Sequence, residues 1–160
     1  DLEELYQEYG FSRNAREDVA VMLQYQGTRV AYPEVKRVLD SLLSRYQLCV
    51  ASTTDTAPLE QDLKRAGLVF HRVFTSQSLK VYKPDHEFYT TILHALSLRP
   101  AEALFVGDSL TDDVQGPQDV GMRACWLNRK GMVPEGVKPD FQIHSLEQLP
   151  SVLESIEREL

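Results

Sequence analysis

The stretch Leu104-Phe-Val-Gly-Asp108-Ser-Leu-Thr-Asp-Asp113 decides how this chain folds and where a ligand can bind. Its first residues are apolar and predict the interior of a buried strand, and Gly107 lets the backbone turn at the strand's end. Asp108 is then left at the carboxyl end of the strand, which is where open α/β sheets bind ligands. Because carboxylate oxygens are ligands that Mg²⁺ accepts, we interpret Asp108 and Asp113 as carboxylates of a magnesium site.

The same acids also have a purely structural interpretation. Asp108-Ser109 can cap the helix that follows, and Asp112-Asp113 can simply favour the positive end of that helix. Acidic residues at helix starts are common, so this stretch alone does not decide between capping and metal binding.

The composition fits one folded domain. With 160 residues, of which 42% are hydrophobic and 26% charged, the chain can bury a real core. The net charge is −7 and the basic residues are scattered, which argues against a nucleic-acid partner. Without a long apolar run or a signal-peptide pattern, we expect no membrane partner and a cytoplasmic location. Cys49 and Cys125 each lie in an apolar run, so we expect small buried hydrophobes and no disulfide.

Around the opening stretch, helical and strand-like patterns alternate, which predicts a parallel sheet with flanking helices. Two helical segments come first, one up to Gly10 and one around residues 16–24. The segments predicted after them are a helix from Pro33, strand 47–52, a helix from Pro58 to Gly67, strand 72–75, a helix capped by Asp85, a strand from Ala103, a short helix towards Gly121, strand 122–127, and a last helix behind the capping box of Ser145 and Gln148.

Polar residues stand near the carboxyl ends of two other predicted strands. Ser52-Thr53-Thr54 ends the strand 47–52, and its hydroxyls and backbone N–H groups can hold phosphate oxygens or can form a simple turn before a helix. Lys83-Pro84-Asp85 stands just before a helix, so Lys83 is held near the ligand-binding edge of the sheet, although a lysine in such a place is usually just solvated.

Together the three motifs resemble motifs two, three and four of the haloacid dehalogenase superfamily, over roughly residues 31–160. The matching stretches are Ser52, Lys83-Pro84-Asp85, Gly107-Asp108-Ser109, Asp113-Val114-Gln115-Gly116, Val120-Gly121-Met122, Trp126-Leu127-Asn128-Arg129 and 139–143. The resemblance implies that Ser52 binds the phosphoryl group and that Lys83 stabilises the phosphoryl charge and the nucleophile. It also implies that Asp108 and Asp113 hold Mg²⁺ directly or through water. Thr53 is a further candidate for phosphate binding, because its hydroxyl stands beside Ser52 at the strand end.

One motif of that family is absent. The Asp-x-Asp-x-Thr stretch, whose first Asp is the family's nucleophile, does not occur before Ser52. We therefore interpret residues 1–30 as the C-terminal part of a helical cap and residues 31–160 as a Rossmann-like core without its first strand. That strand is expected between the strands ending at Ser52 and Gly107. A smaller departure is Pro117, where the family often has Ala.

The sequence thus predicts an α/β protein of Rossmann-like topology with a cap remnant. The activity implied by the resemblance is Mg²⁺-dependent hydrolysis of a small phosphorylated metabolite through an aspartyl-phosphate intermediate. The alternatives are a 2-haloacid dehalogenase, against which the pair Asp108 and Asp113 argues, and a non-catalytic binding protein of the same fold. The oligomeric state is not predicted. The histidines show no metal-ligand spacing, and Tyr32, Tyr82 and Tyr89 are expected to be packing or surface aromatics.

Overall fold

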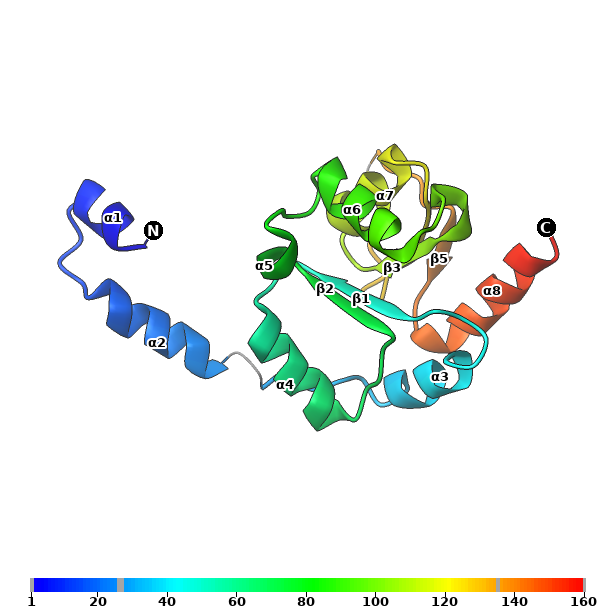
Figure 1. Ribbon diagram of the computed structural model, residues 1–160, viewed down its shortest axis with the longest axis horizontal. Coiled ribbons are helices and arrows are strands. Elements are labelled where there is room, and N and C mark those ends of the chain that lie inside the picture. Colours follow the sequence, from blue (N-terminus) through cyan, green and yellow to red (C-terminus); the bar gives the residue numbers. More distant parts are fainter. Residues whose placement is uncertain (1, 26–27, 135, 160) are drawn as a thin grey trace.

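The computed structural model describes residues 2–25, 28–134 and 136–159 (Figure 1). Of the predicted cap remnant, residues 1, 26 and 27 lie outside the described residues. The elements are α1 (Leu2–Glu8), α2 (Ala15–Tyr25), α3 (Val35–Leu42), β1 (Cys49–Ser52), α4 (Thr56–Ala66), β2 (Arg72–Thr75), α5 (Ser76–Leu79), α6 (His86–Leu96), the 3₁₀ turn η1 (Pro100–Glu102), β3 (Leu104–Gly107), the π-helix η2 (Leu110–Gln115), α7 (Gly116–Asp119), β4 (Arg123–Leu127), β5 (Phe141–Ile143), the 3₁₀ turn η3 (Leu146–Gln148) and α8 (Leu149–Glu157).

The strands are parallel, as predicted, but they form two sheets. β1 pairs with β2 so that Ser52 is opposite Thr75, and β3 pairs with β4 so that Gly107 is opposite Trp126. β5 extends the second sheet beside β4. Within the described residues no strand joins β1 to β3, and this is the position that the sequence assigned to the missing strand. The inner edges of β1 and β3 therefore lack a β-sheet partner.

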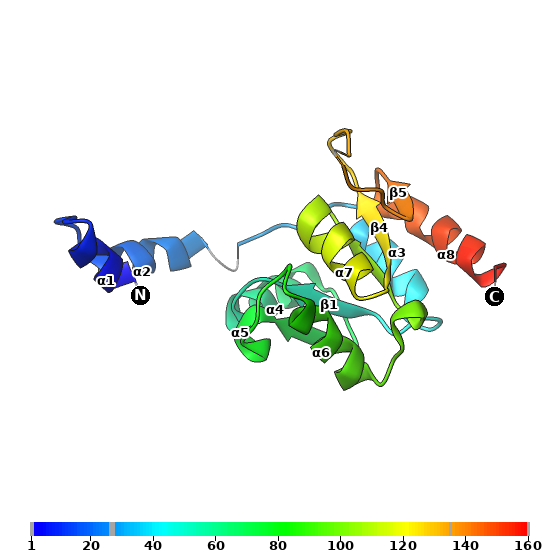
Figure 2. The ribbon, with the colours of Figure 1, turned by 90° about the horizontal axis from the view of Figure 1, so that it is seen from above.

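Successive side chains of β3 point to opposite faces, and each face packs in a different hydrophobic core. Phe105 packs in a cluster with Phe88 and Tyr89 of α6, and Ala51 of β1 joins the same cluster. Leu104 and Val106 point the other way, towards a cluster built from α3, α8 and β4. Figure 2 shows α6 beside β1, and α3 and α8 near β4 and β5. Because α6 contacts both sheets, apolar packing holds them together although no strand hydrogen bonds do.

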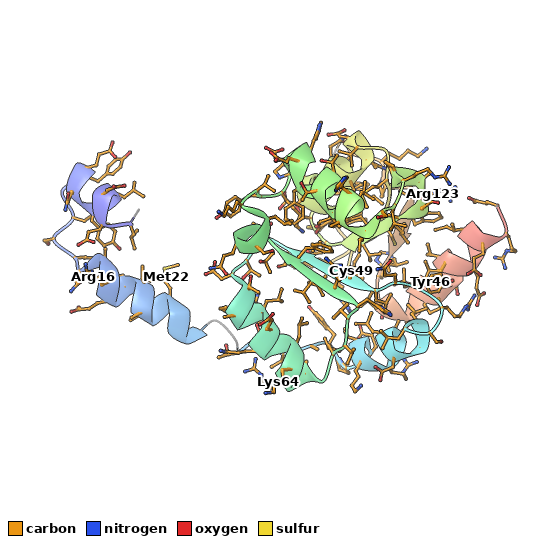
Figure 3. The ribbon with its side chains drawn as sticks, viewed as in Figure 1. Arg16, Met22, Tyr46, Cys49, Lys64 and Arg123 are labelled. Carbon is orange, nitrogen blue, oxygen red and sulfur yellow. The ribbon has the colours of Figure 1, made fainter. Side chains whose placement is uncertain are left out.

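Helices α1 and α2 lie to one side of the sheets (Figures 1 and 2) and contact each other. The two helices and the loop between them expose large apolar side chains, among them Tyr9 and Phe11 of the loop and Met22 of α2, which is labelled in Figure 3. The segment after α2 is fixed to the sheet region, since the backbone N–H and Nε of Arg29 donate to Asp62 of α4. Such exposed apolar surface is what a remnant of a larger helical cap would present.

The predicted caps are confirmed. The Asp85 side chain accepts a hydrogen bond from the N–H of Glu87, and the capping box of Ser145 and Gln148 is complete. That box opens η3 and not α8, which begins at Leu149 and so has Pro150 in its first turn. The sequence did not predict α5, β5 or the π-helix η2. Both cysteines are free thiols; Cys125 is buried and Cys49 is half-buried. No described helix has the length and apolarity needed to span a membrane.

Candidate functional site

The candidate site begins where β3 ends, with Asp108 and the π-helix η2 behind it. Ser109 caps this helix, because its hydroxyl accepts a hydrogen bond from the N–H of Asp112 at 3.1 Å. Its carbonyl also accepts from the N–H of Asp113 at 2.8 Å. The structural interpretation of Asp108-Ser109 as a cap is thus correct for Ser109. The carboxylate of Asp113 remains available for a different contact.

That contact is a buried ion pair with Lys83. Nζ of Lys83 lies 2.6 Å from Oδ1 of Asp113, and the two side chains are only 11% and 7% exposed. The N–H of Ser109 donates to the second carboxylate oxygen, Oδ2, at 2.9 Å. Nζ also lies 5.3 Å from the centre of the Phe105 ring. The structure therefore brings together Lys83 and Asp113, which are 30 residues apart in the sequence, and surrounds the lysine charge with a carboxylate and an aromatic face.

Gly107 makes room for this pair. A Cβ at position 107 would lie 2.3 Å from both Cγ and Oδ2 of Asp113. Gly107 is the last residue of β3, and the chain bends at the next residue, Asp108. Because Gly107 has no positive φ, that bend does not by itself require a glycine. The glycine is needed because the Asp113 carboxylate rests directly against the strand backbone.

Gly107→Ala is expected to displace the Asp113 carboxylate from Lys83. Overpacking of this kind costs about 1–3 kcal/mol of unfolding free energy, and a shift of a positioned group by about 1 Å can lower turnover by about 10²-fold. Val106→Ala is the matched control, because Val106 points to the opposite face of β3. The control should lose stability and keep its turnover. Equal turnover of Gly107→Ala and Val106→Ala in a steady-state assay would contradict the packing argument.

The arrangement of Asp108 fits part of a magnesium shell. Its carboxylate is exposed at the end of β3, and its carbonyl accepts a hydrogen bond at 3.0 Å from the indole Nε1 of the buried Trp126. Among the described residues no group of three or more His, Cys, Asp or Glu side chains forms a closed metal site. Mg²⁺ does not require one, since it commonly takes one or two carboxylates and completes its octahedron with water and substrate oxygens. Asp108 and Asp113 are suitable as those two carboxylates.

Ser52 and Thr53 lie at the carboxyl end of β1, half-buried and exposed respectively. The described contacts do not link either side chain to Lys83. The sequence analysis missed two hydrogen bonds that fix the segment after them to the junction of β2 and α5. Thr56 Oγ1, at the start of α4, lies 2.6 Å from Thr75 Oγ1, and the hydroxyl of Ser76 donates to the carbonyl of Thr54 at 3.3 Å. The signal was available, because Thr75-Ser76 is a second hydroxyl pair at a strand end.

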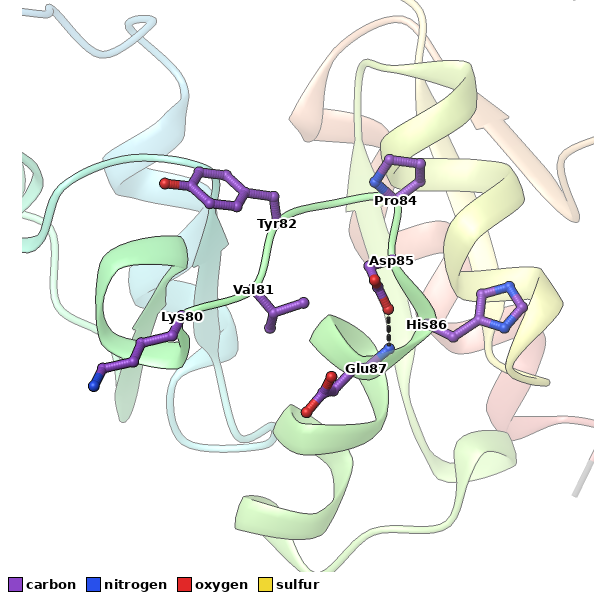
Figure 4. A pocket seen from close by; sticks show the side chains of 7 residues that line it. All are labelled: Lys80, Val81, Tyr82, Pro84, Asp85, His86 and Glu87. Carbon is purple, nitrogen blue, oxygen red and sulfur yellow. Dashed lines mark hydrogen bonds between the residues drawn. The ribbon is translucent and has the colours of Figure 1, made fainter. Parts of the chain in front are cut away.

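The segment that carries Lys83 also forms an open pocket on its outer side. Figure 4 shows its lining, which includes Tyr82, Asp85 and His86. Lys83 is not part of that lining, since its amine reaches Asp113 instead. The candidate site is therefore the ion pair of Lys83 and Asp113, together with the exposed Asp108 at the end of β3, and not this pocket.

Comparison with known proteins identifies the family. A profile of the haloacid dehalogenase-like hydrolases matches residues 1–127. The chain belongs to the haloacid dehalogenase-like hydrolases. The match begins at residue 1 and so includes α1 and α2, whereas the sequence resemblance covered roughly residues 31–160.

Relatives within the haloacid dehalogenase-like hydrolases include both phosphatases and dehalogenases. The chain is 34% identical over 122 residues to the pyrimidine 5'-nucleotidase PynA of Streptococcus pneumoniae, covering 73% of this chain and 52% of the relative. It is 33% identical to the crystal structure of a 2-haloacid dehalogenase from Pseudomonas syringae, with a TM-score of 0.76, covering 88% of this chain and 60% of the other.

The magnesium-bound structure of the HAD-hydrolase YfnB from Bacillus subtilis is also similar, at 26% identity with a TM-score of 0.72. The match covers 76% of this chain and 55% of that one. This chain spans about half the length of the curated relatives it matches. The fold and the family are thus shared with enzymes that are considerably longer.

Proposed function

We propose that the protein containing this chain is a Mg²⁺-dependent phosphatase that acts on a small phosphorylated metabolite. The observation that carries the proposal is the buried pair of Lys83 and Asp113 beside the exposed Asp108, at the carboxyl edge of a parallel sheet. A lysine with a buried carboxylate, next to a second carboxylate, can neutralise phosphoryl charge and help to hold a hard cation. The phosphatases among the relatives support the same reaction class.

Each residue has a role in this proposal. Lys83 supplies a fixed positive charge for the phosphoryl oxygens, and Asp113 holds the lysine amine in place through the 2.6 Å contact. Asp108 and Asp113 provide carboxylates for the cation, which supplies electrostatic stabilisation of the transferring group when bound. Ser52 and Thr53 donate hydrogen bonds to the phosphate from the end of β1. The nucleophile is an aspartate that precedes this sequence in an Asp-x-Asp-x-Thr segment.

The domain assignment is part of the proposal. Residues 1–30 are the end of a helical cap, and residues 31–160 are the core without its first strand. The exposed apolar residues of α1 and α2 and the separation of the strands into two sheets support this division. The expected cytoplasmic location remains a prediction.

A 2-haloacid dehalogenase is the second candidate, favoured by the similarity to the Pseudomonas syringae structure. Such an enzyme needs no metal, so two carboxylates at the end of β3 would have no evident use in it. The third candidate is a binding protein of this fold that lacks a nucleophile. Parallel assays of phosphate release and of chloride release from a 2-chloro acid separate all three, because the binding protein gives neither product.

Asp108→Asn is expected to remove most phosphatase activity from the protein that includes the upstream segment, and chelation of Mg²⁺ is expected to do the same. The physical reason is that a neutral amide oxygen holds a divalent cation far less well than a carboxylate. Circular dichroism should show an intact fold, because Asp108 is exposed. Asp40→Asn on α3 is the control, since Asp40 is exposed and pairs with the exposed Lys36 in the same helix. Full activity in excess chelator would exclude the magnesium site.

A further inference from the structure

The π-helix η2 leaves one carbonyl without its usual helical partner. The N–H of Gly116 donates to the carbonyl of Thr111, five residues earlier. In that pattern the carbonyl of Asp112 should accept from residue 117. Residue 117 is proline, which has no N–H. The carbonyl of Asp112, directly before the ion-paired Asp113, therefore needs a donor from outside the helix.

Tyr89 provides that donor. Its hydroxyl lies 2.6 Å from the carbonyl oxygen of Asp112. Tyr89 is 1% exposed and packs edge-on against Phe105, with ring centres 5.6 Å apart. Burial, with smaller contributions from the neighbouring carboxylates, raises the pKa of Tyr89, so the hydroxyl keeps its proton and remains a donor.

Gly116 shows how closely this contact is fitted. A Cβ at position 116 would lie 2.3 Å from the hydroxyl oxygen of Tyr89. Tyr89 also stands on α6, whose start is capped by Asp85, only two residues after Lys83. One short segment thus holds two consecutive residues of η2, because Lys83 binds the carboxylate of Asp113 and Tyr89 binds the carbonyl of Asp112.

We propose that Tyr89 is a positioning residue of the cation site, whose hydroxyl replaces the backbone amide that Pro117 removes from η2. Without this hydrogen bond, the carbonyl of Asp112 has neither a helical N–H donor nor the Tyr89 hydroxyl. Asp113 is then less well held at the place where it meets Lys83 and the cation. This inference rests on the proposed function only for the identity of the cation. The hydrogen-bond geometry stands without it.

The test is a double-variant cycle in the protein that includes the upstream segment, with Tyr89→Phe, Pro117→Ala and the two combined. Tyr89→Phe keeps the ring packing and removes only the hydroxyl. We expect it to weaken Mg²⁺ binding, measured by isothermal titration calorimetry, by about 10-fold, as is typical for groups that orient metal ligands. Pro117→Ala returns an N–H to position 117. In that background Tyr89→Phe should weaken Mg²⁺ binding by less than about 2-fold, well below the loss that is typical when a group that orients a metal ligand is removed.

Tyr46→Phe is the matched control. Its hydroxyl donates to Glu157, the last residue of α8. Tyr46 itself is labelled in Figure 3 and lies near α8. Loss of its hydroxyl should leave Mg²⁺ affinity unchanged. Unaltered affinity of Tyr89→Phe overturns the proposal, and so does an equal loss in both backgrounds. If the single variant does not fold and the double variant does, the replacement of the amide is supported directly.

Failure of the proposed function gives a different result. In that case the parent protein binds no Mg²⁺, and thermal melts of the same four proteins decide the inference. The inference is supported if Tyr89→Phe lowers the melting temperature more in the protein with Pro117 than in the Pro117→Ala variant. Equal losses in the two backgrounds overturn it.

Discussion

Residues 1–160 alone are expected to hydrolyse p-nitrophenyl phosphate no faster than buffer, whereas a protein that adds an upstream Asp-x-Asp-x-Thr strand is expected to show Mg²⁺-dependent turnover. The reason lies in how the carboxylates of the site are used. Both oxygens of Asp113 accept hydrogen bonds, one from Lys83 and one from Ser109. Asp108, like Asp113, is assigned to the cation. Neither is left as a nucleophile, and covalent phosphoryl transfer requires one.

The same comparison has a stability readout. An added strand that pairs with β1 and β3 would satisfy backbone groups on both inner edges, and each buried unsatisfied group costs about 1–3 kcal/mol. Circular dichroism melts should therefore show a higher melting temperature for the longer protein. The control is the longer protein with Asn in place of the first Asp of the added motif. It should keep the higher melting temperature of the longer protein and show no turnover. Metal-dependent turnover by residues 1–160 alone would require a nucleophile that the proposed mechanism does not contain.

Lys83→Met is expected to lower turnover of the longer protein by about 10²-fold or more, because the lysine charge acts on the transition state, where phosphoryl charge is spread over several oxygens. It should also lower the free energy of unfolding by about 3–5 kcal/mol, since it leaves a carboxylate that is only 7% exposed without its partner. Phosphate release and urea denaturation measure the two effects.

Two further variants separate charge from packing in that result. Lys83→Met combined with Asp113→Asn should recover part of the lost stability, because no uncompensated charge is then buried, and it should remain inactive. Lys80→Met is the matched control, since Lys80 is exposed on the same segment. Parental turnover of Lys83→Met would refute the role of the lysine, and a large loss in Lys80→Met would show that the whole segment is sensitive to substitution.

The parts of the fold that depend on local patterns were predictable. Strand β2 was predicted with the bounds 72–75 that the structure shows, because a short apolar run between polar residues is a local signal. The caps at Asp85 and Ser145 were also predictable from residue type and spacing. The division into two sheets was not predicted, but it falls between β1 and β3, where the resemblance placed the strand that the sequence lacks.

The parts that depend on tertiary contacts were not predictable. A π-helix and an α-helix have nearly the same apolar pattern over one turn, so η2 was expected as an ordinary short helix. The packing reason for Gly107 was missed, because the carboxylate that rests against its backbone belongs to Asp113, six residues later. Tyr89 was correctly expected to pack, but its hydrogen bond to Asp112 depends on how α6 lies on η2.

The open inner edges of β1 and β3 have a practical consequence for anyone who works with this chain. Two sheets held together by apolar side chains can accept a strand that is supplied as a separate molecule, because main-chain hydrogen bonds give such strand addition its affinity. The chain is therefore suited to fragment complementation, in which a synthetic strand peptide restores a split fold. The same edges can also capture one another between copies, so the chain should be handled at low concentration.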